Sequence, residues 1–144
     1  MLIETKDKIS KLIQFDEGFV GKMYEDIKGN NTIGFGFNLD KIEMPYQIAV
    51  HWIDLIIDQI SYSLINSTIN GSFFNHLNDA RRYVIINMVY QMGFAGFMKF
   101  TKLIDALKNG DFDSAVKEMI NSKWHNEFKD RSNRLIKIMQ IGEF

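Results

Sequence analysis

The fold of the N-terminal part of the chain is decided by one stretch, which runs Tyr24-Glu25-Asp26-Ile27-Lys28-Gly29-Asn30-Asn31-Thr32-Ile33-Gly34-Phe35-Gly36-Phe37-Asn38. Residues 28–31 carry turn-forming side chains, and the residues after them alternate with a period of two. We expect one face of this strand to be packed by Ile33, Phe35 and Phe37. The opposite face carries Thr32, Gly34, Gly36 and Asn38. Its two glycines clear it of side chains, as happens where a ligand approaches the backbone. The stretch predicts a β-hairpin with room for a third short strand.

Apolar residues at helical spacing predict helices on both sides of this hairpin. A first helix is expected from about Thr5 to Glu17, because Gly18 can adopt the left-handed conformation that ends a helix. Pro45 suits the first turn of a long helix over about 46–67. Further helices are expected over 78–91, 100–109, 111–122 and 130–141. The chain is therefore expected to be mostly helical with one small sheet, which is the α+β class.

Composition narrows the class of protein. The 144 residues predict a single domain, 1–144, and the net charge of −1 gives no indication of a nucleic-acid partner. Cysteine is absent, and the three histidines are scattered without metal-ligand spacing, so neither a disulfide nor a metal site is expected. The N-terminus does not resemble a secretory signal. The stretch near Tyr83–Val89 is too short to span a bilayer, so we expect no membrane insertion.

Three side chains around the hairpin suit the hydrolysis of a sugar acetal, which requires one carboxyl group to protonate the leaving oxygen and a second group to direct water. Glu17 lies at the C-terminal end of the first predicted helix, where the helix dipole disfavours added negative charge. Partial burial against Phe15 or its neighbours would act in the same direction, so we expect Glu17 to keep its proton, as an acid catalyst must. Asp26, on a polar hairpin, is expected to stay ionised, and Thr32 is expected to hold the attacking water.

Each of these residues alone has a simpler explanation. A Glu near a helix end is usually a solvated surface residue, an Asp on a hairpin usually forms the turn, and a Thr is a good strand former. The combination with Tyr24 and the glycines is much less common by chance. It favours a catalytic site formed by Glu17, Asp26 and Thr32.

These residues, and a second run farther along the chain, resemble those of a known family. The spacing of Glu17, Asp26 and Thr32 is similar to the catalytic signature of the phage-type lysozymes, glycoside hydrolase family 24. The run Ile86-Asn87-Met88-Val89-Tyr90-Gln91-Met92-Gly93 resembles the central buried helix of the lysozymes of T-even bacteriophages. The resemblance covers about Ile9–Phe37 and Asp79–Ile138. The segment 40–78 matches poorly and looks shorter than in those relatives.

The resemblance implies a lysozyme-like fold of two lobes with a cleft between them. It places a small hairpin lobe at about 16–45 and an inter-lobe helix at about 46–67. The larger helical lobe is expected at about 72–144 together with the first helix.

The resemblance also implies roles for particular residues. Glu17 is expected to be the general acid, with Asp26 and Thr32 positioning the water in an inverting reaction. Gly36 and Asn38 from the hairpin, and Tyr90 and Gln91 from the cleft wall, are expected to bind substrate. Arg131 is expected to face Glu17, and Arg134 to pair with Asp16. The implied substrate is peptidoglycan, cut between N-acetylmuramic acid and N-acetylglucosamine, with no cofactor.

Several alternatives stay open. Phe37, Leu103 and Glu118 differ from the residues at the corresponding positions of the best-known relatives, so the chain is also consistent with a non-catalytic wall-binding module of a virion. A third alternative keeps the enzyme but changes its substrate to chitin oligomers. For an endolysin we expect accumulation in the host cytoplasm, a separate holin for release to the cell wall, and a monomer. A virion-associated lysozyme is the alternative location.

Overall fold

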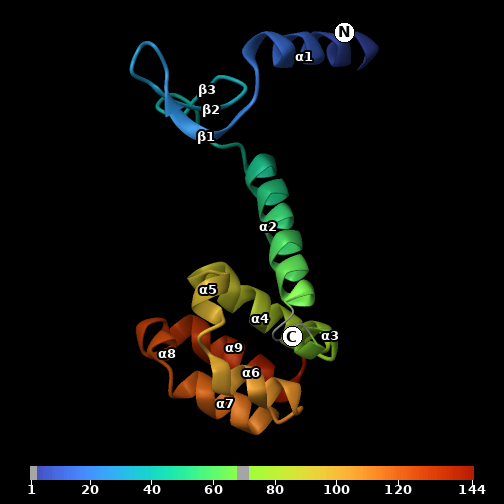
Figure 1. The fold of residues 1–144 in the computed structure, drawn as a ribbon, viewed down its shortest axis with the longest axis vertical. Coiled ribbons are helices and arrows are strands. Elements are labelled where there is room, and N and C mark those ends of the chain that lie inside the picture. Colours follow the sequence, from blue (N-terminus) through green and yellow to red (C-terminus); the bar gives the residue numbers. More distant parts are fainter. Residues whose placement is uncertain (1–2, 68–71) are drawn as a thin grey trace. The chain divides into compact units, whose positions relative to one another are not determined.

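The structure is a computed structural model that describes residues 3–67 and 72–144. It divides into two compact units, Met1–Ala49 and Val50–Phe144 (Figure 1). Helices dominate, and one three-stranded antiparallel sheet lies in the first unit. The predicted mostly helical α+β fold is therefore confirmed, whereas the predicted lobe boundaries stay a prediction.

The first unit begins with helix α1 (Ile3–Glu17). Gly18 follows it with a φ of 67°, and its N–H donates a hydrogen bond to the carbonyl of Gln14 over 3.0 Å. A left-handed glycine directly after the last turn is a common way to end a helix. The helix ends where the sequence predicts, and it starts two residues earlier than expected. The family resemblance also groups this helix with the larger helical lobe, and that grouping stays a prediction.

The sheet of the first unit has the strand order β1-β2-β3. Its strands are β1 (Val20–Glu25), β2 (Asn31–Gly34) and β3 (Phe37–Asn38). Val20 pairs with Gly34 and Tyr24 pairs with Thr32, so four steps along β1 match only two along β2. This mismatch is a β-bulge, which bends a strand and increases its twist. The third short strand that the sequence allowed is present.

The two faces of the hairpin are not divided as expected. Thr32 is 3% exposed and Gly34 is buried, whereas Ile33 and Phe35 are only half-buried and Phe37 is 50% exposed. The reason is that the Phe37 ring folds back over Gly34, where a Cβ atom would lie only 2.9 Å from Phe37 Cδ2. Gly34 is thus required by a neighbouring side chain of the same hairpin, and the prediction that its face is clear for a ligand is wrong.

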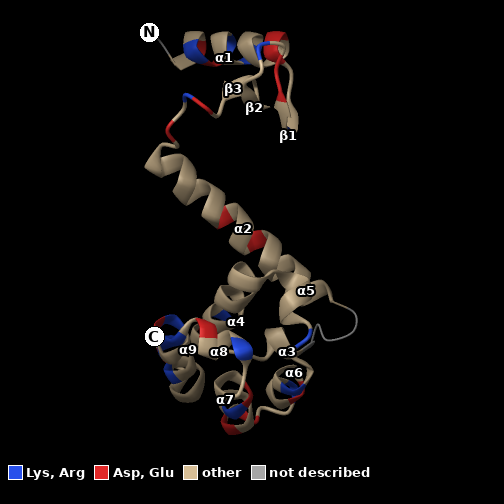
Figure 2. Ribbon diagram, turned by 90° about the vertical axis from the view of Figure 1, so that its left-hand side faces the viewer, with Lys and Arg blue, Asp and Glu red and all other residues tan. Residues whose placement is uncertain are grey.

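Helix α2 (Tyr46–Asn66) runs across the boundary between the two units, and it matches the long helix predicted over 46–67. Asp54 and Asp58 are its only Asp, Glu, Lys or Arg residues (Figure 2). Among the described residues it is the one helix long and apolar enough to cross a membrane, with a mean hydropathy of 1.3 and 11% of that window buried. The apolar stretch weighed as a membrane span from the sequence was Tyr83–Val89 and not α2. The absence of membrane insertion therefore stays a prediction.

The described part of the second unit is helical. After α2 it contains α3 (Ser72–Asn75), α4 (Asp79–Met92), α5 (Phe94–Phe97), α6 (Thr101–Lys108), α7 (Phe112–Ile120), α8 (Lys123–Glu127) and α9 (Lys129–Ile141). The four helices predicted here lie within two residues of the observed bounds, which is the usual uncertainty at helix ends. The short helices α3, α5 and α8 were not predicted.

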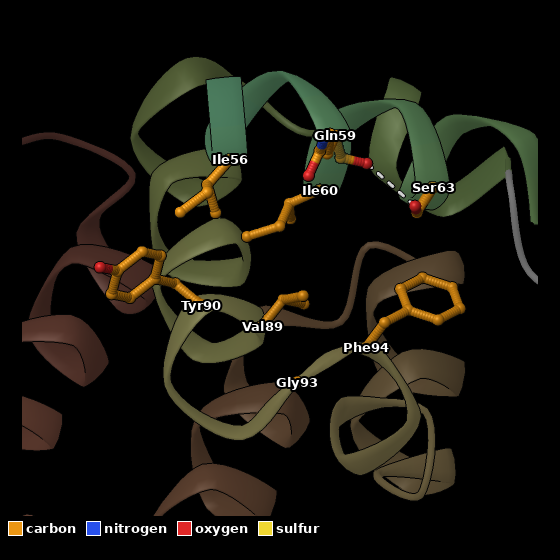
Figure 3. A pocket seen from close by; sticks show the side chains of 8 residues that line it. All are labelled: Ile56, Gln59, Ile60, Ser63, Val89, Tyr90, Gly93 and Phe94. Carbon is orange, nitrogen blue, oxygen red and sulfur yellow. Dashed lines mark hydrogen bonds between the residues drawn. The ribbon is translucent and has the colours of Figure 1, made fainter. Parts of the chain in front are cut away.

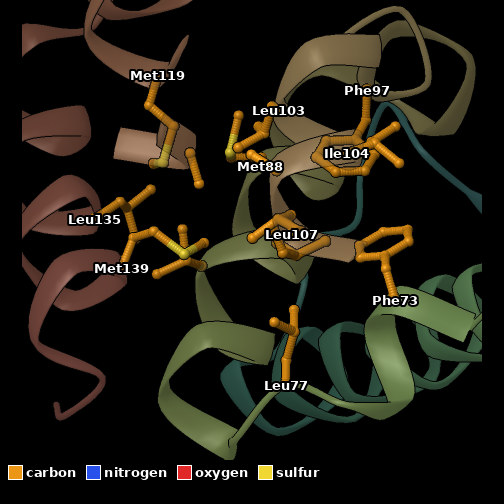
Figure 4. Close-up of a cluster of buried hydrophobic side chains, with 14 of the residues drawn as sticks. Phe73, Leu77, Met88, Phe97, Leu103, Ile104, Leu107, Met119, Leu135 and Met139 are labelled. Carbon is orange, nitrogen blue, oxygen red and sulfur yellow. The ribbon is translucent and has the colours of Figure 1, made fainter. Parts of the chain in front are cut away.

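Helix α4 lies at the centre of this unit. Val84, Ile85 and Met88 are completely buried, as expected for a helix with almost no polar side. Figure 4 shows Met88 among side chains from α6, α7 and α9, including Leu103, Met119 and Met139. Because the core surrounds it, α4 fixes the positions of the residues in its last turn, Tyr90 and Gln91 among them.

The start of α4 is tied to the end of α9. Asn78 caps α4 by accepting a hydrogen bond from the N–H of Arg81 over 3.0 Å, and its Nδ2 donates to the carbonyl of Gly142 over 2.8 Å. Arg81 Nε donates to the carbonyl of Met139 over 2.9 Å, and its guanidinium stacks on the Phe112 ring. These contacts join segments about sixty residues apart in the chain.

Candidate active site

Glu17 is the last residue of α1, and its carboxylate lies against the backbone of Gly36. A Cβ atom at Gly36 would lie 2.7 Å from Glu17 Oε2, so only glycine leaves room for the carboxylate there. Gly36 also has a φ of 74°, which side chains other than glycine rarely adopt. Phe15, which was expected to shield Glu17, is itself 85% exposed. The turn between β2 and β3 therefore positions Glu17, and the expected burial against Phe15 is not observed.

Asp26 follows β1 and accepts hydrogen bonds from the tight turn that leads into β2. Its Oδ1 accepts from the N–H of Lys28 over 2.8 Å and from the N–H of Asn30 over 2.9 Å. The amide Nδ2 of Asn30 lies 3.1 Å from Oδ1 and 2.9 Å from Oδ2. The backbone and side-chain hydrogen bonds from Asn30 lower the pKa of Asp26, and the backbone N–H and the positive charge of Lys28 lower it further. This direction agrees with the expectation that Asp26 stays ionised, while its role in catalysis stays a prediction.

Thr32 lies on β2, opposite Tyr24 on one side and Asn38 on the other. Its hydroxyl donates a hydrogen bond to the carbonyl of Asn30 over 3.1 Å. Since that donation uses the single hydroxyl proton, the oxygen can only accept from a further partner. Its role in holding water stays a prediction.

Asn38 and Gly36 lie on the same hairpin. Asn38 Oδ1 accepts a hydrogen bond from the N–H of Asp40 over 3.0 Å. Among the residues that the structure describes, the amide nitrogen of Asn38 has no acceptor. The space beside the Cα atom of Gly36 is filled by the carboxylate of Glu17. The structure therefore supplies a positional reason for Gly36, and substrate binding by either residue stays a prediction.

Tyr90 and Gln91 lie at the end of α4 in the second unit. Tyr90 is 47% exposed and lines a pocket of about 490 Å³ together with Ile56, Gln59, Ile60, Ser63, Val89, Gly93 and Phe94 (Figure 3). Gln91 Oε1 accepts a hydrogen bond from Trp124 Nε1 over 2.9 Å. This contact fixes the amide of Gln91 so that its NH₂ group points away from Trp124.

The two arginines expected to support catalysis have partners within the second unit. Arg131 Nε donates to Asn87 Oδ1 over 2.8 Å, and one terminal nitrogen of Arg134 donates to the carbonyl of Asp130 over 3.1 Å. Asp16 and Glu17 belong to the first unit. The predicted pairs of Arg131 with Glu17 and of Arg134 with Asp16 stay predictions.

Leu103 and Glu118, two of the positions that differ from the best-known relatives, line a second pocket of about 350 Å³ with Lys99, Phe100, Thr101, Lys102, Asn121 and Ser122. Leu103 is 1% exposed and belongs to the core. Within residues 3–67 and 72–144, no group of three or more His, Asp or Glu side chains is placed to hold a metal ion.

Asn30, which contacts both Asp26 and Thr32, was not among the site residues predicted from the sequence. The available signal was its place four residues after an aspartate in a glycine-containing turn. That pattern is also what an ordinary turn requires, because Asp side chains often bond to the backbone of a turn they begin.

Comparison with known proteins defines the class. The sequence profile described as Phage lysozyme matches residues 14–137. The chain therefore belongs to the phage lysozyme family, as its sequence motifs predict, and it is a lysozyme, an enzyme whose substrate is peptidoglycan.

Three relatives are similar over 93% of this chain. Probable T4-type lysozyme 2 of Dictyostelium discoideum is 28% identical over 160 residues, with 94% of that protein covered. Probable T4-type lysozyme 1 of the same organism is 26% identical, also with 94% covered. The pre-baseplate central spike protein Gp5 of Enterobacteria phage T4 is 24% identical, and the alignment covers 28% of its length.

Proposed function

We propose that this lysozyme is a muramidase that hydrolyses the β-1,4 bond between N-acetylmuramic acid and N-acetylglucosamine. In this proposal Glu17 protonates the leaving oxygen, while Asp26 and Thr32 direct water to the anomeric carbon. The observation that carries it is that this member of the family holds two carboxylates in unlike settings, Glu17 at the end of α1 and Asp26 in the turn between β1 and β2. Glu17 lies against Gly36, and Asp26 accepts hydrogen bonds that keep it ionised. Two carboxylates with different environments are the usual basis of an acid and a base.

The proposed reaction inverts the anomeric carbon, because Asp26 acts through a water molecule and does not attack the sugar itself. Inverting glycosidases keep their two carboxyl groups far enough apart to admit that water. The configuration of the first product, read by proton NMR during cleavage, distinguishes inversion from retention.

The experiment that tests the proposed roles compares Glu17→Gln with Glu25→Gln. Glu25 is an exposed carboxylate at the end of β1 in the same unit, so it controls for the loss of one charge. We expect Glu17→Gln to abolish the release of reducing ends from purified peptidoglycan, since an amide cannot act as the acid. We expect Glu25→Gln to keep its activity, and circular dichroism to show both variants folded. Undiminished turnover by Glu17→Gln would remove the proposal.

The same assay separates the remaining alternatives. Binding to peptidoglycan without release of reducing ends would support a wall-binding module, and preferential cleavage of N-acetylglucosamine oligomers would support a chitin substrate. Mass spectrometry of fragments ending in reducing N-acetylmuramic acid would establish the muramidase.

We further propose that the protein is an endolysin that works as a monomer and needs a separate holin to reach the wall. The relatives of nearly equal length favour a free enzyme, while the similarity to a baseplate spike protein also allows association with a virion. Expression in a bacterium with and without a membrane-permeabilising protein tests the holin requirement. Lysis only when both are present is the expected result. Sedimentation of the purified protein tests the monomer.

A further inference from the structure

Asn30 forms hydrogen bonds to both residues that are proposed to direct the attacking water, Asp26 and Thr32. Its backbone N–H and its side-chain amide donate to the carboxylate of Asp26 at distances of 2.9 to 3.1 Å. Its backbone carbonyl accepts from the N–H of Asp26 over 3.0 Å and from the hydroxyl of Thr32 over 3.1 Å. Every hydrogen bond that the structure gives Asn30 therefore goes to Asp26 or to Thr32.

The two oxygens of Asp26 are used unequally. Oδ1 accepts hydrogen bonds from the backbone N–H groups of Lys28 and Asn30, and the side-chain amide of Asn30 is shared between Oδ1 and the nearer Oδ2. A carboxylate oxygen has two lone pairs, so Oδ1 has no free acceptor direction and Oδ2 has one. The atom of Asp26 left to accept a proton is therefore Oδ2.

The hydroxyl of Thr32 is constrained in a complementary way. Because its proton points to the carbonyl of Asn30, its oxygen can receive a hydrogen from water but cannot donate one to it. A water molecule that donates one hydrogen to Thr32 and the other to Oδ2 of Asp26 keeps a lone pair free. That lone pair is what attacks the anomeric carbon.

We propose that Asn30 is the positioning residue of the hydrolytic site, which orients Asp26 so that Oδ2 receives the proton of water and fixes Thr32 as an acceptor. This inference rests on the proposed function. In the step it serves, the water oxygen bonds to the anomeric carbon as the glycosidic bond breaks. One water proton passes to Oδ2 of Asp26, and the proton of Glu17 passes to the leaving oxygen. Asn30 touches neither the sugar nor the water.

The test compares Asn30→Ala with Asn31→Ala. Asn31 is a matched control because it makes the same kind of contact to another carboxylate, with its N–H 2.9 Å from Asp40 Oδ2 and its Nδ2 3.1 Å from Asp40 Oδ1. Two readouts are recorded for each variant. Carbon-13 NMR follows the titration of the Asp26 carboxyl, and the dependence of kcat/KM on pH is measured with soluble peptidoglycan fragments.

We expect Asn30→Ala to raise the pKa of Asp26 and to move the acidic limb of kcat/KM to higher pH by the same interval. The value of kcat should fall on the order of tenfold to a hundredfold, the range that a small misplacement of a catalytic group produces, while KM stays unchanged. Asn31→Ala should leave both the titration and the acidic limb where they are in the wild type. If Asn30→Ala does not fold, Asn30→Leu replaces it, because it keeps the size of the side chain and the backbone contacts and loses the amide donor without adding a charge beside Asp26.

An acidic limb that stays in place in the Asn30 variant, with kcat equal to that of Asn31→Ala, would overturn the inference and leave Asn30 a turn-forming residue. A shifted Asp26 titration with an unchanged acidic limb would overturn it as well. Failure of the proposed function looks different, because the wild-type enzyme would then release no reducing ends at any pH.

Discussion

Replacing Gly36 by alanine tests whether this glycine serves Glu17. The new Cβ atom would lie 2.7 Å from Glu17 Oε2, whereas ordinary contact begins at 3.4 Å, so the oxygen must move by about 0.7 Å (3.4 − 2.7). A misplacement of about 1 Å can cost a reaction on the order of a hundredfold in rate, so we expect kcat to fall by about ten- to a hundredfold. The left-handed φ of 74° adds about 1–2 kcal/mol of backbone strain, which a typical domain tolerates.

Gly110→Ala is the control for this change. Gly110 has a similar φ of 66°, but a Cβ atom there meets nothing within 4 Å, so the variant carries the strain without the crowding. Initial rates of reducing-end release give kcat and KM, and urea denaturation gives the free energy of unfolding. We expect similar losses of stability in the two variants but a fall in kcat only for Gly36→Ala. Equal kcat values would refute the reasoning, and a raised KM with unchanged kcat would assign Gly36 to substrate binding instead.

Three further predictions concern the rest of the chain. Trp124→Phe removes the 2.9 Å hydrogen bond to Gln91, so we expect a higher KM with little change in kcat, measured by initial rates. Asn78→Ala loses the cap of α4 and the bond to the carbonyl of Gly142, which should lower the free energy of unfolding in urea by about 1–2 kcal/mol. The pKa of Asp111 is lowered from 3.8 because Ser114 donates hydrogen bonds to its carboxylate. The ionised carboxylate of Asp111 therefore stabilises the fold above pH 3.8. This stabilisation is lost as the pH falls through the lowered pKa of the folded protein. The thermal midpoint should drop on acidification, and less steeply in Asp111→Asn.

Much of the fold follows from local sequence signals. Gly18 ends α1 and the Gly29 turn begins β2, because a positive φ or a tight turn can be read from neighbouring residues. The longer helices were predicted to within two residues because several turns of apolar spacing define each one. Helices α3, α5 and α8, of four or five residues, were missed because so short a helix contains little more than one turn.

What the sequence does not reveal depends on contacts between side chains. The two faces of β2 were assigned by alternation, which does not tell which face is covered. The covering contact is the Phe37 ring over Gly34, and it depends on how the turn after β2 folds. Asn30 was overlooked for a similar reason, since only the distances show that its amide reaches both oxygens of Asp26. Glu17, Asp26 and Thr32 were identified by a family resemblance, and spacing alone would not have selected them.

The joining of α4 to α9 bears on how the protein forms during synthesis. Asn78 and Arg81 bond to carbonyls of residues 139–142, so α4 lacks these partners until residues 139–142 have left the ribosome. The contacts of the hairpin in the first unit, in contrast, join residues that are close in the chain. Domains fold in order as they emerge during translation. The hairpin that carries Asp26 therefore has its own contacts available on the nascent chain, while the contacts between α4 and α9 form only once residues 139–142 have emerged.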